Sequence, residues 1–188
     1  MDLSYSAEYE RFRDQVRAFL AASWPPKGDE AKLGPIVNAD YFGTVPAERL
    51  QVADGVIRFS GDGQYRSKIG LTPQRAKPVL GSYDATRQLL TLVQYTKPEG
   101  ATDYVNSMWE LQEEPFAGDA INSYNDGPPA PGKAPLGPFY ELETSSPALE
   151  LAPRKSITHN HSTFHFQGDV NELDDIAQQT LGVSIPEI

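Results

Sequence analysis

From Tyr41 onward the chain consists of short apolar runs separated by turn residues, and this punctuation limits the possible fold more than any other feature. The 188 residues include 16 prolines and 15 glycines. Proline breaks helices and glycine favours tight turns, so long helices are excluded from most of this region. Apolar runs of roughly four to eight residues between turns are typical of strands. The sequence therefore predicts a mainly β fold, specifically an antiparallel β-sandwich.

The individual runs predict where the strands and loops lie. Asp54-Gly55 predicts a two-residue hairpin loop, because glycine adopts positive φ without steric cost. The proline- and glycine-rich segment Asn122–Pro138 has no periodicity and predicts a long loop, which is usually functional or disordered. The expected strands are Arg49–Val52, Val56–Ser60, Tyr65–Leu71, Val79–Tyr83, Leu89–Tyr95, Tyr104–Glu110, Phe139–Thr144 and Ser156–Phe166.

A helix is expected at each end of the sandwich. Apolar residues at three- and four-residue steps predict an amphipathic helix over residues 1–24, which Trp24-Pro25-Pro26 ends. At the other end, Asp169 and Glu172 have capping-box spacing, and Gly182 suits a helix stop. The predicted organisation is an N-terminal helix with a linker over residues 1–35 and a β-sandwich domain over residues 36–188.

Composition and charge narrow the classes of partner. The formal net charge is −10, which argues against a nucleic-acid or anionic-membrane partner. The chain has no cysteine, so disulfides, thiolate metal sites and cysteine nucleophiles are excluded. The sequence shows no signal-peptide pattern and no apolar run of about 18 residues, so a cytoplasmic location is expected.

All three histidines lie in the stretch from Phe139 to Phe166. On an extended segment His159, His161 and His165 fall on one face, with phenylalanines on the other. His159 and His161 would lie ~6.7 Å apart, so with a neighbouring carboxylate they could form a two-histidine, one-carboxylate site for zinc or iron. His165 lies further along and would join only through a bulge or bend. The alternative is a row of solvated or hydrogen-bonded polar residues.

Two glutamates in the same stretch are candidate acid–base residues. Glu141 and Glu143 share a strand face and are backed by aromatic and aliphatic neighbours that could raise a carboxyl pKa. An exposed strand face explains them equally well. Candidate ligand-binding residues lie elsewhere in the chain. Trp109 could supply an aromatic platform, and Arg75 belongs to a modest basic cluster with Lys68. Tyr124, Asn125 and Asp126 lie in a loop that offers amide and carboxylate groups.

Residues 1–26, MDLSYSAEYERFRDQVRAFLAASWPP, resemble the opening helix of acyl-CoA dehydrogenases. The rest resembles the C-terminal half of an uncharacterised bacterial family whose fold looks like that of aldose 1-epimerases. The resemblance is carried by YFGTVPAERL, GDGQYRSKIGLTPQRAKPVLGSYD, LTLVQYTKPEGATDYVNSMWELQ, INSYNDGPP and FYELETSSPALELAPRKSITHNHSTFHF. It implies part of a galactose-mutarotase-like supersandwich, in which Glu141 matches the general base that takes the anomeric hydroxyl proton.

The resemblance also has departures. Arg154 and Lys155 stand where epimerases usually have Gly-Glu, and the epimerases' acid histidine lies upstream, so that role is not carried onto the histidines of this chain. A partial supersandwich leaves apolar sheet surface that the N-terminal helix, or a second copy in a homodimer, would cover. We therefore expect a protein that binds or modifies a sugar-like small molecule. The alternatives are a cupin-like metal-dependent enzyme and a non-catalytic dimerising half-domain.

Overall fold

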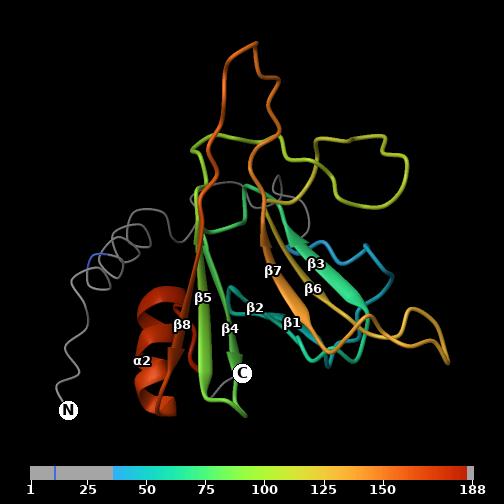
Figure 1. Ribbon diagram of the computed structural model, residues 1–188. Helices are drawn as coiled ribbons and strands as arrows, with labels where there is room; N and C mark the ends of the chain where they lie inside the picture. The colour runs from blue at the N-terminus through green and yellow to red at the C-terminus, as the bar shows by residue number, and fades with distance from the viewer. Residues whose placement is uncertain (1–10, 12–35, 186–188) are drawn as a thin grey trace. The chain divides into compact units, whose positions relative to one another are not determined.

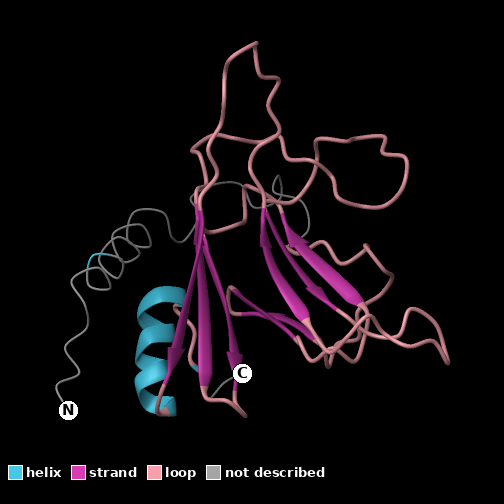
Figure 2. Ribbon diagram, viewed as in Figure 1, coloured by secondary structure: helices cyan, strands magenta, loops and turns pink. Residues whose placement is uncertain are grey.

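The computed structural model describes Arg11 and residues 36–185, and these residues form a mainly β fold with one helix near the C-terminus (Figures 1 and 2). The predicted N-terminal helix lies, apart from Arg11, outside the described residues. The elements are β1 (Leu50–Ala53), β2 (Val56–Phe59), β3 (Ser67–Leu71), β4 (Val79–Asp84), β5 (Leu89–Tyr95), β6 (Ile121–Asn125), β7 (Tyr140–Thr144), β8 (His161–Gln167) and α2 (Val170–Leu181).

The strands form three sheets: β1-β2, β3-β6-β7 and β4-β5-β8. The hairpin β1-β2 turns at Asp54 and Gly55, which both have positive φ, at 51° and 76°. These values are those of a type I′ turn, whose twist matches that of the flanking strands. The predicted two-residue hairpin is therefore confirmed.

The chain divides by its contacts into two compact units. The described part of the first is Arg11 with residues 81–92 and 164–185, and that of the second is residues 36–80 with 93–163. In the first unit α2 packs on the strands through Leu173, Ile176 and Ala177, which meet Leu90 and Leu92 of β5. Burying a large aliphatic side chain stabilises a fold by about 1.5–3 kcal/mol. The amphipathic helix therefore contributes much of this core.

The ends of α2 follow the predicted capping. Asp169 is the N-cap, and its side chain accepts a hydrogen bond from the backbone N–H of Asn171 at 2.9 Å. Gly182 adopts the left-handed conformation at the C-terminus, and its N–H donates to the carbonyls of Ala177 and Gln178. Both signals were present in the sequence, and the helix is confirmed.

The second unit contains the sheet β3-β6-β7 and a core of Ala76, Tyr95, Tyr104, Ala120 and Ile121. Both strand pairs of this sheet are antiparallel, with β6 in the centre. Figure 1 shows the three strands running together, with the loop from 126 to 139 beyond one end of β6.

Three predicted elements differ from the structure by more than two residues. Residues 121–125 form a central strand, so the predicted loop Asn122–Pro138 begins four residues too early. The predicted strand Tyr104–Glu110 is wrong, since Tyr104 makes an isolated bridge to Ala117 and the residues after it form no strand.

The third difference is the start of β8, which begins at His161 rather than at Ser156. The partner strand β5 ends at Tyr95, and Thr96 makes the last backbone bond to Asn160 before Pro98. Proline has no N–H to donate, so the ladder does not continue.

Candidate functional site

A row of residues crosses the sheet of the second unit on one face. Asn38 pairs with Gly70 of β3, Gly70 with Asn122 of β6, and Asn122 with Glu143 of β7. Residues opposite each other in a sheet point to the same side. The row therefore brings two amides and a carboxylate from distant parts of the chain onto one surface.

Gly70 leaves a gap in this row that a buried carboxylate fills. A Cβ at Gly70 would lie 2.0 Å from Asp119 Oδ2 and 2.6 Å from Asn122 Nδ2, well inside van der Waals contact. Asp119 itself is only 3% exposed. Because Gly70 has no side chain, Asp119 can lie against the sheet at this position.

Asp119 is held by two neutral donors. The Tyr41 hydroxyl donates to Asp119 Oδ2 at 2.7 Å, and Asn38 Nδ2 donates to the same oxygen at 3.2 Å. Burial raises the pKa of the Asp119 carboxyl, and the two hydrogen bonds and the charge of Lys68 offset part of that rise. Burial and the Asp119 carboxylate raise the pKa of Tyr41 to about 12. The Tyr41 hydroxyl therefore keeps its proton at neutral pH and donates a hydrogen bond to Asp119.

Lys68 and Glu143 extend this group across the sheet. Lys68 Nζ donates to Glu143 Oε2 at 3.0 Å and lies 5.3 Å from the centre of the Tyr41 ring. Asn122 Nδ2 donates to the Tyr41 hydroxyl at 2.9 Å. The other carboxylate oxygen, Glu143 Oε1, is buried and has no hydrogen-bond partner among the described residues. We call these residues the polar cluster: Asn38, Tyr41, Lys68, Asp119, Asn122 and Glu143.

Aromatic rings lie on the same sheet face beside the polar cluster. Tyr124 is two residues beyond Asn122 on β6, and its ring lies 5.8 Å from Phe42 and 6.0 Å from Phe139. Phe42 is 39% exposed, and the Arg66 guanidinium lies 4.4 Å from its ring centre. Glu141 is the direct partner of Tyr124 on β7 and is exposed. Cation, carboxylate and aromatic groups therefore share one surface.

The two glutamates predicted as acid–base residues thus share a face of β7, but they differ in surroundings. Glu143 belongs to the polar cluster and is paired with Lys68, whereas Glu141 lies next to Tyr124 at the exposed part of the face. Both are accessible in part from the same side of the sheet. Glu143 is the better placed of the two to contact a ligand together with other polar groups.

The predicted ligand-binding residues at the end of β6 hold a loop in place. Asn125 is fully buried, accepts from the Gly63 N–H at 2.8 Å, and donates to Asp62 and to the carbonyl of Tyr65. Asp126 accepts from the Tyr124 hydroxyl at 2.7 Å and from the Gly137 N–H at 2.8 Å. These hydrogen bonds give Asn125 and Asp126 internal partners, so of this group only Tyr124, itself buried, packs against the aromatic rings of this sheet face.

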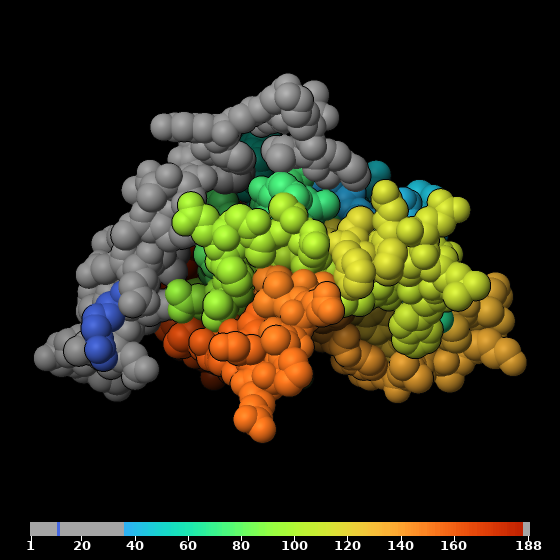
Figure 3. Space-filling model, turned by 90° about the horizontal axis from the view of Figure 1, so that it is seen from above, coloured from blue at the N-terminus to red at the C-terminus, as the bar shows by residue number. Residues whose placement is uncertain are grey.

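The other two predicted ligand-binding residues lie elsewhere. Trp109 is 91% exposed in the loop that follows Tyr104. Arg75 is half-buried, and its backbone N–H donates to the Thr72 carbonyl in the turn after β3. Neither belongs to the polar cluster. Figure 3 shows the view from above, in which the loops around residues 105–116 and 145–160 lie at the surface.

The three histidines separate into a pair and a single residue. Thr144 Oγ1 lies 2.9 Å from His159 Nε2 and 2.8 Å from His161 Nδ1, whereas His165 Nδ1 lies 3.0 Å from Thr91 Oγ1. Thr144 alternates with Glu143 on β7, so the pair and the carboxylate lie on opposite faces. Within Arg11 and residues 36–185, no group of three or more histidines and carboxylates is arranged to hold a metal. The predicted combination of two imidazoles with Glu141 or Glu143 is therefore not formed.

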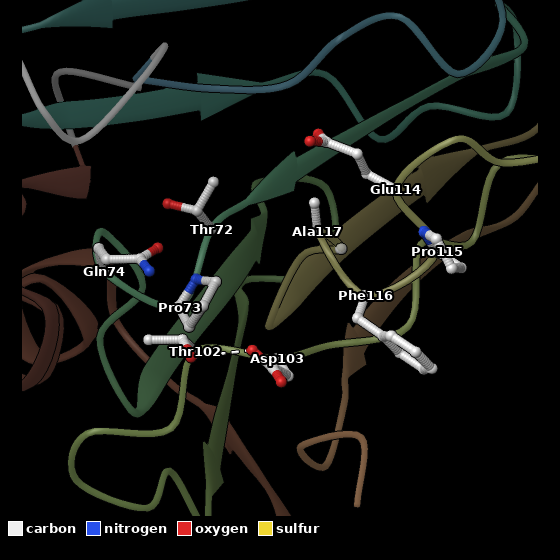
Figure 4. Close-up of a pocket in the computed structure, with 10 residues that line it drawn as sticks. Thr72, Pro73, Gln74, Thr102, Asp103, Glu114, Pro115, Phe116 and Ala117 are labelled. Atoms are coloured by element: carbon white, nitrogen blue, oxygen red, sulfur yellow. Dashed lines mark hydrogen bonds between the residues drawn. The ribbon is translucent and has the colours of Figure 1, made fainter.

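A hollow of about 420 Å³ lies at a different place in the second unit. Figure 4 shows Thr72, Glu114 and Phe116 around it, and the Thr102 hydroxyl donates to Asp103 at 2.9 Å. None of the residues that the sequence predicted as site residues lines this hollow. It has carboxylates and one aromatic ring, but no cation among its lining residues.

Sequence reasoning missed most of the polar cluster. It proposed Glu143 and placed Lys68 in the basic cluster with Arg75, but it did not propose Asn38, Tyr41, Asp119 or Asn122. One available signal was Gly70 inside an otherwise regular strand pattern, since such a glycine often marks the close approach of another group. The residue that approaches, Asp119, lies 49 positions later and has no local pattern that points to it.

The comparisons with other proteins reach only a family without an assigned activity. Residues 24–188 match a family described as "Family of unknown function (DUF6786)". No curated protein and no solved structure matches the chain. In the described part of the chain, no helix is both long enough and apolar enough to cross a membrane.

Proposed function

We propose, for a chain that belongs to the DUF6786 family of unknown function, that it binds a sugar-like small molecule on the face of the sheet β3-β6-β7. The observation that carries the proposal is the combination of Glu143 and Lys68 with exposed aromatic surface at Phe42 on the same face. A sugar presents hydroxyl groups at its rim and C–H groups on its faces. A site for it needs polar groups and an aromatic ring side by side.

The polar cluster supplies both kinds of hydrogen-bonding group. Glu143 offers a carboxylate acceptor on a side chain that is 33% exposed, with Oε2 beside Lys68 and Oε1 buried. Lys68 offers a donor whose position is fixed by Glu143, while Asn122 is buried and holds the Tyr41 hydroxyl in place. Binding sites for small ligands usually combine a few placed polar groups with apolar contacts. Because these groups are already held in position, little ordering is required when a ligand binds.

Resemblance to the aldose 1-epimerases supports a more specific form of the proposal. It gives Glu141 the role of the base that takes the anomeric proton, within a fold of the galactose-mutarotase type. Glu141 is exposed on the same sheet face as the polar cluster, two residues before Glu143 on β7. In this form of the proposal Glu143 and Lys68 hold the sugar, and Glu141 moves the proton.

Sugar binding can be tested by saturation-transfer NMR and calorimetry with D-galactose, D-glucose and their anomers. Glu143→Gln and Phe42→Ala should each weaken binding, and Phe42→Ala should also reduce saturation transfer to the sugar C–H protons. Glu150→Gln is the matched control, because Glu150 is an exposed carboxylate outside the polar cluster. Equal binding by all three variants, or no binding of any aldose by the wild type, would contradict the proposal.

Proton transfer requires a separate measurement. Polarimetry of freshly dissolved α-D-galactose and α-D-glucose reports the rate of anomer interconversion. If the epimerase form holds, the wild type should exceed the buffer rate, and Glu141→Gln should remove the excess while sugar binding persists. If sugar binds but the rate of anomer interconversion equals that in buffer, the protein binds sugar without acting as an isomerase, and the epimerase form of the proposal is wrong.

A further inference from the structure

Thr144, His159 and His161 form a compact group in the second unit, separate from the polar cluster. Thr144 is the last residue of β7, His161 is the first of β8, and His159 precedes it by two positions. His159 Nε2 and His161 Nδ1 both lie within hydrogen-bonding distance of one atom, Thr144 Oγ1. The hydroxyl is therefore placed between two imidazole nitrogens.

The hydroxyl cannot satisfy both nitrogens in the same way. It carries one proton, so it donates to one imidazole and accepts from the other. The second ring nitrogen of His159, Nδ1, is buried and has no hydrogen-bond partner among the described residues. The nitrogen through which His159 contacts the Thr144 hydroxyl is Nε2. The Tyr95 ring, 5.9 Å from the His159 ring, packs on the same side chain.

We propose that Thr144, His159 and His161 form a binding site for a divalent transition-metal ion that prefers imidazole ligands, such as Zn²⁺ or Cu²⁺. Two imidazole nitrogens from one short segment already lie close to the same atom, Thr144 Oγ1, so little conformational entropy is lost in bringing them together around an ion. Imidazole suits zinc and copper, and nitrogen sites bind Cu²⁺ more tightly than the other first-row divalent ions. The Thr144 hydroxyl or water supplies the remaining ligands.

The geometry requires one small adjustment. An ion bound by all three groups would lie between Thr144 Oγ1 and the two nitrogens. With bonds of about 2.0–2.1 Å in a tetrahedral site the ligand atoms are about 3.3 Å apart, so both nitrogens must move slightly away from Thr144 Oγ1, which is now 2.9 and 2.8 Å from them. His161 is exposed, and its ring can rotate without disturbing packed neighbours. The overall charge of −10 favours the approach of a cation.

His165 provides an internal control. It follows His161 on the same exposed face of β8, but its Nδ1 lies against Thr91 rather than against another imidazole. His165 therefore matches His161 in residue type, strand and exposure, but no second imidazole lies beside it. The chain contains only these three histidines, so the effect of each can be separated.

The experiment is titration of the full, tag-free chain with Zn²⁺ by calorimetry and with Cu²⁺ by electron paramagnetic resonance. We expect one ion per chain and nitrogen hyperfine splitting on the Cu²⁺ signal. His159→Ala and His161→Ala should each weaken binding by more than about tenfold, whereas His165→Ala should bind as the wild type does.

Thermal unfolding of each variant without metal establishes that it is folded before the titrations are compared. Added Zn²⁺ should raise the Tm of the wild type and of His165→Ala, but not of His159→Ala or His161→Ala. The proposal is overturned if the wild type binds neither ion, if His165→Ala loses binding as much as the paired variants do, or if the paired variants bind like the wild type.

Discussion

The Asp119 carboxylate occupies the space in which a side chain on Gly70 would lie, so one residue's lack of a Cβ determines where the other's charge is placed. The two residues come from different segments, and β6 links them, because Asn122 pairs with Gly70 and follows Asp119 by three positions. Strand pairing therefore brings the polar cluster together. The space that Gly70 leaves free determines where the buried Asp119 carboxylate lies.

Gly70→Ala tests this relationship. A Cβ at 2.0 Å from Asp119 Oδ2 and 2.6 Å from Asn122 Nδ2 must push both groups away, so the free energy of unfolding should fall by about 1–3 kcal/mol. Urea unfolding gives the value. Gly137→Ala is the matched control, since a Cβ there would meet only the Phe139 ring, at 3.5 Å, which is ordinary van der Waals contact. A similar loss in both variants would show that the Gly70 gap has no special role.

The pH dependence of stability should report the environment of Asp119. Burial raises the pKa of its carboxyl in the folded state, so in the acid range the folded chain holds a proton that the unfolded chain has released. Protonation of Asp119 therefore stabilises the fold at low pH. This stabilisation is lost as the pH rises through the pKa that Asp119 has in the folded state. Asp119→Asn removes this dependence. The unfolding free energy of the wild type minus that of Asp119→Asn should fall as pH rises from acid to neutral, and a flat difference would contradict the assignment.

Tyr41→Phe isolates the hydroxyl that joins Asp119 to Asn122. The substitution keeps the ring beside Lys68 but removes the donor to Asp119 and the acceptor for Asn122 Nδ2. Leaving buried polar groups without partners costs about 1–3 kcal/mol, and the unfolding free energy should fall by that amount in urea unfolding. Tyr65→Phe is a suitable control, since the Tyr65 hydroxyl makes one exposed bond to the Thr44 carbonyl and should be nearly neutral. If Tyr41→Phe were as neutral as the control, the hydroxyl would not hold the polar cluster together.

The sequence predicted the parts of this fold whose signals are local. The Asp54-Gly55 turn, the strand Leu89–Tyr95 and the caps of α2 depend on neighbouring residues, and all three are confirmed. The predicted placement of Glu141 and Glu143 on one face also follows from alternation along a single strand.

The parts that were missed depend on distant contacts. Ile121–Asn125 has one apolar residue at its start and polar residues at three of its other positions, so its pattern does not indicate a buried strand. It becomes one because β3 and β7 pair with both of its edges and the Asn122 and Asn125 side chains find internal partners.

The strand predicted at Tyr104–Glu110 fails for a different reason. Side chains there bond to nearby backbone groups: Asn106 Oδ1 accepts from the Met108 N–H, and Gln112 donates to the Met108 carbonyl. Such local bonds compete with strand pairing. The apolar residues that suggested a strand are instead a buried Tyr104 and an exposed Trp109.

Asn125→Ala tests whether the end of β6 is held by its side-chain amide. Asn125 is fully buried and bonds to the Gly63 N–H, to Asp62 and to the Tyr65 carbonyl, so removing the amide leaves several polar groups unpaired. The unfolding free energy should fall by about 2 kcal/mol or more, measured by urea unfolding. Gln51→Ala, at an exposed position of β1, is the control and should change little. Because Asn125 makes these bonds from the strand that also carries Asn122, its loss should additionally weaken sugar binding at the polar cluster. Unchanged stability with Asn125→Ala would mean that the strand pairs of β6 alone fix this end of the sheet.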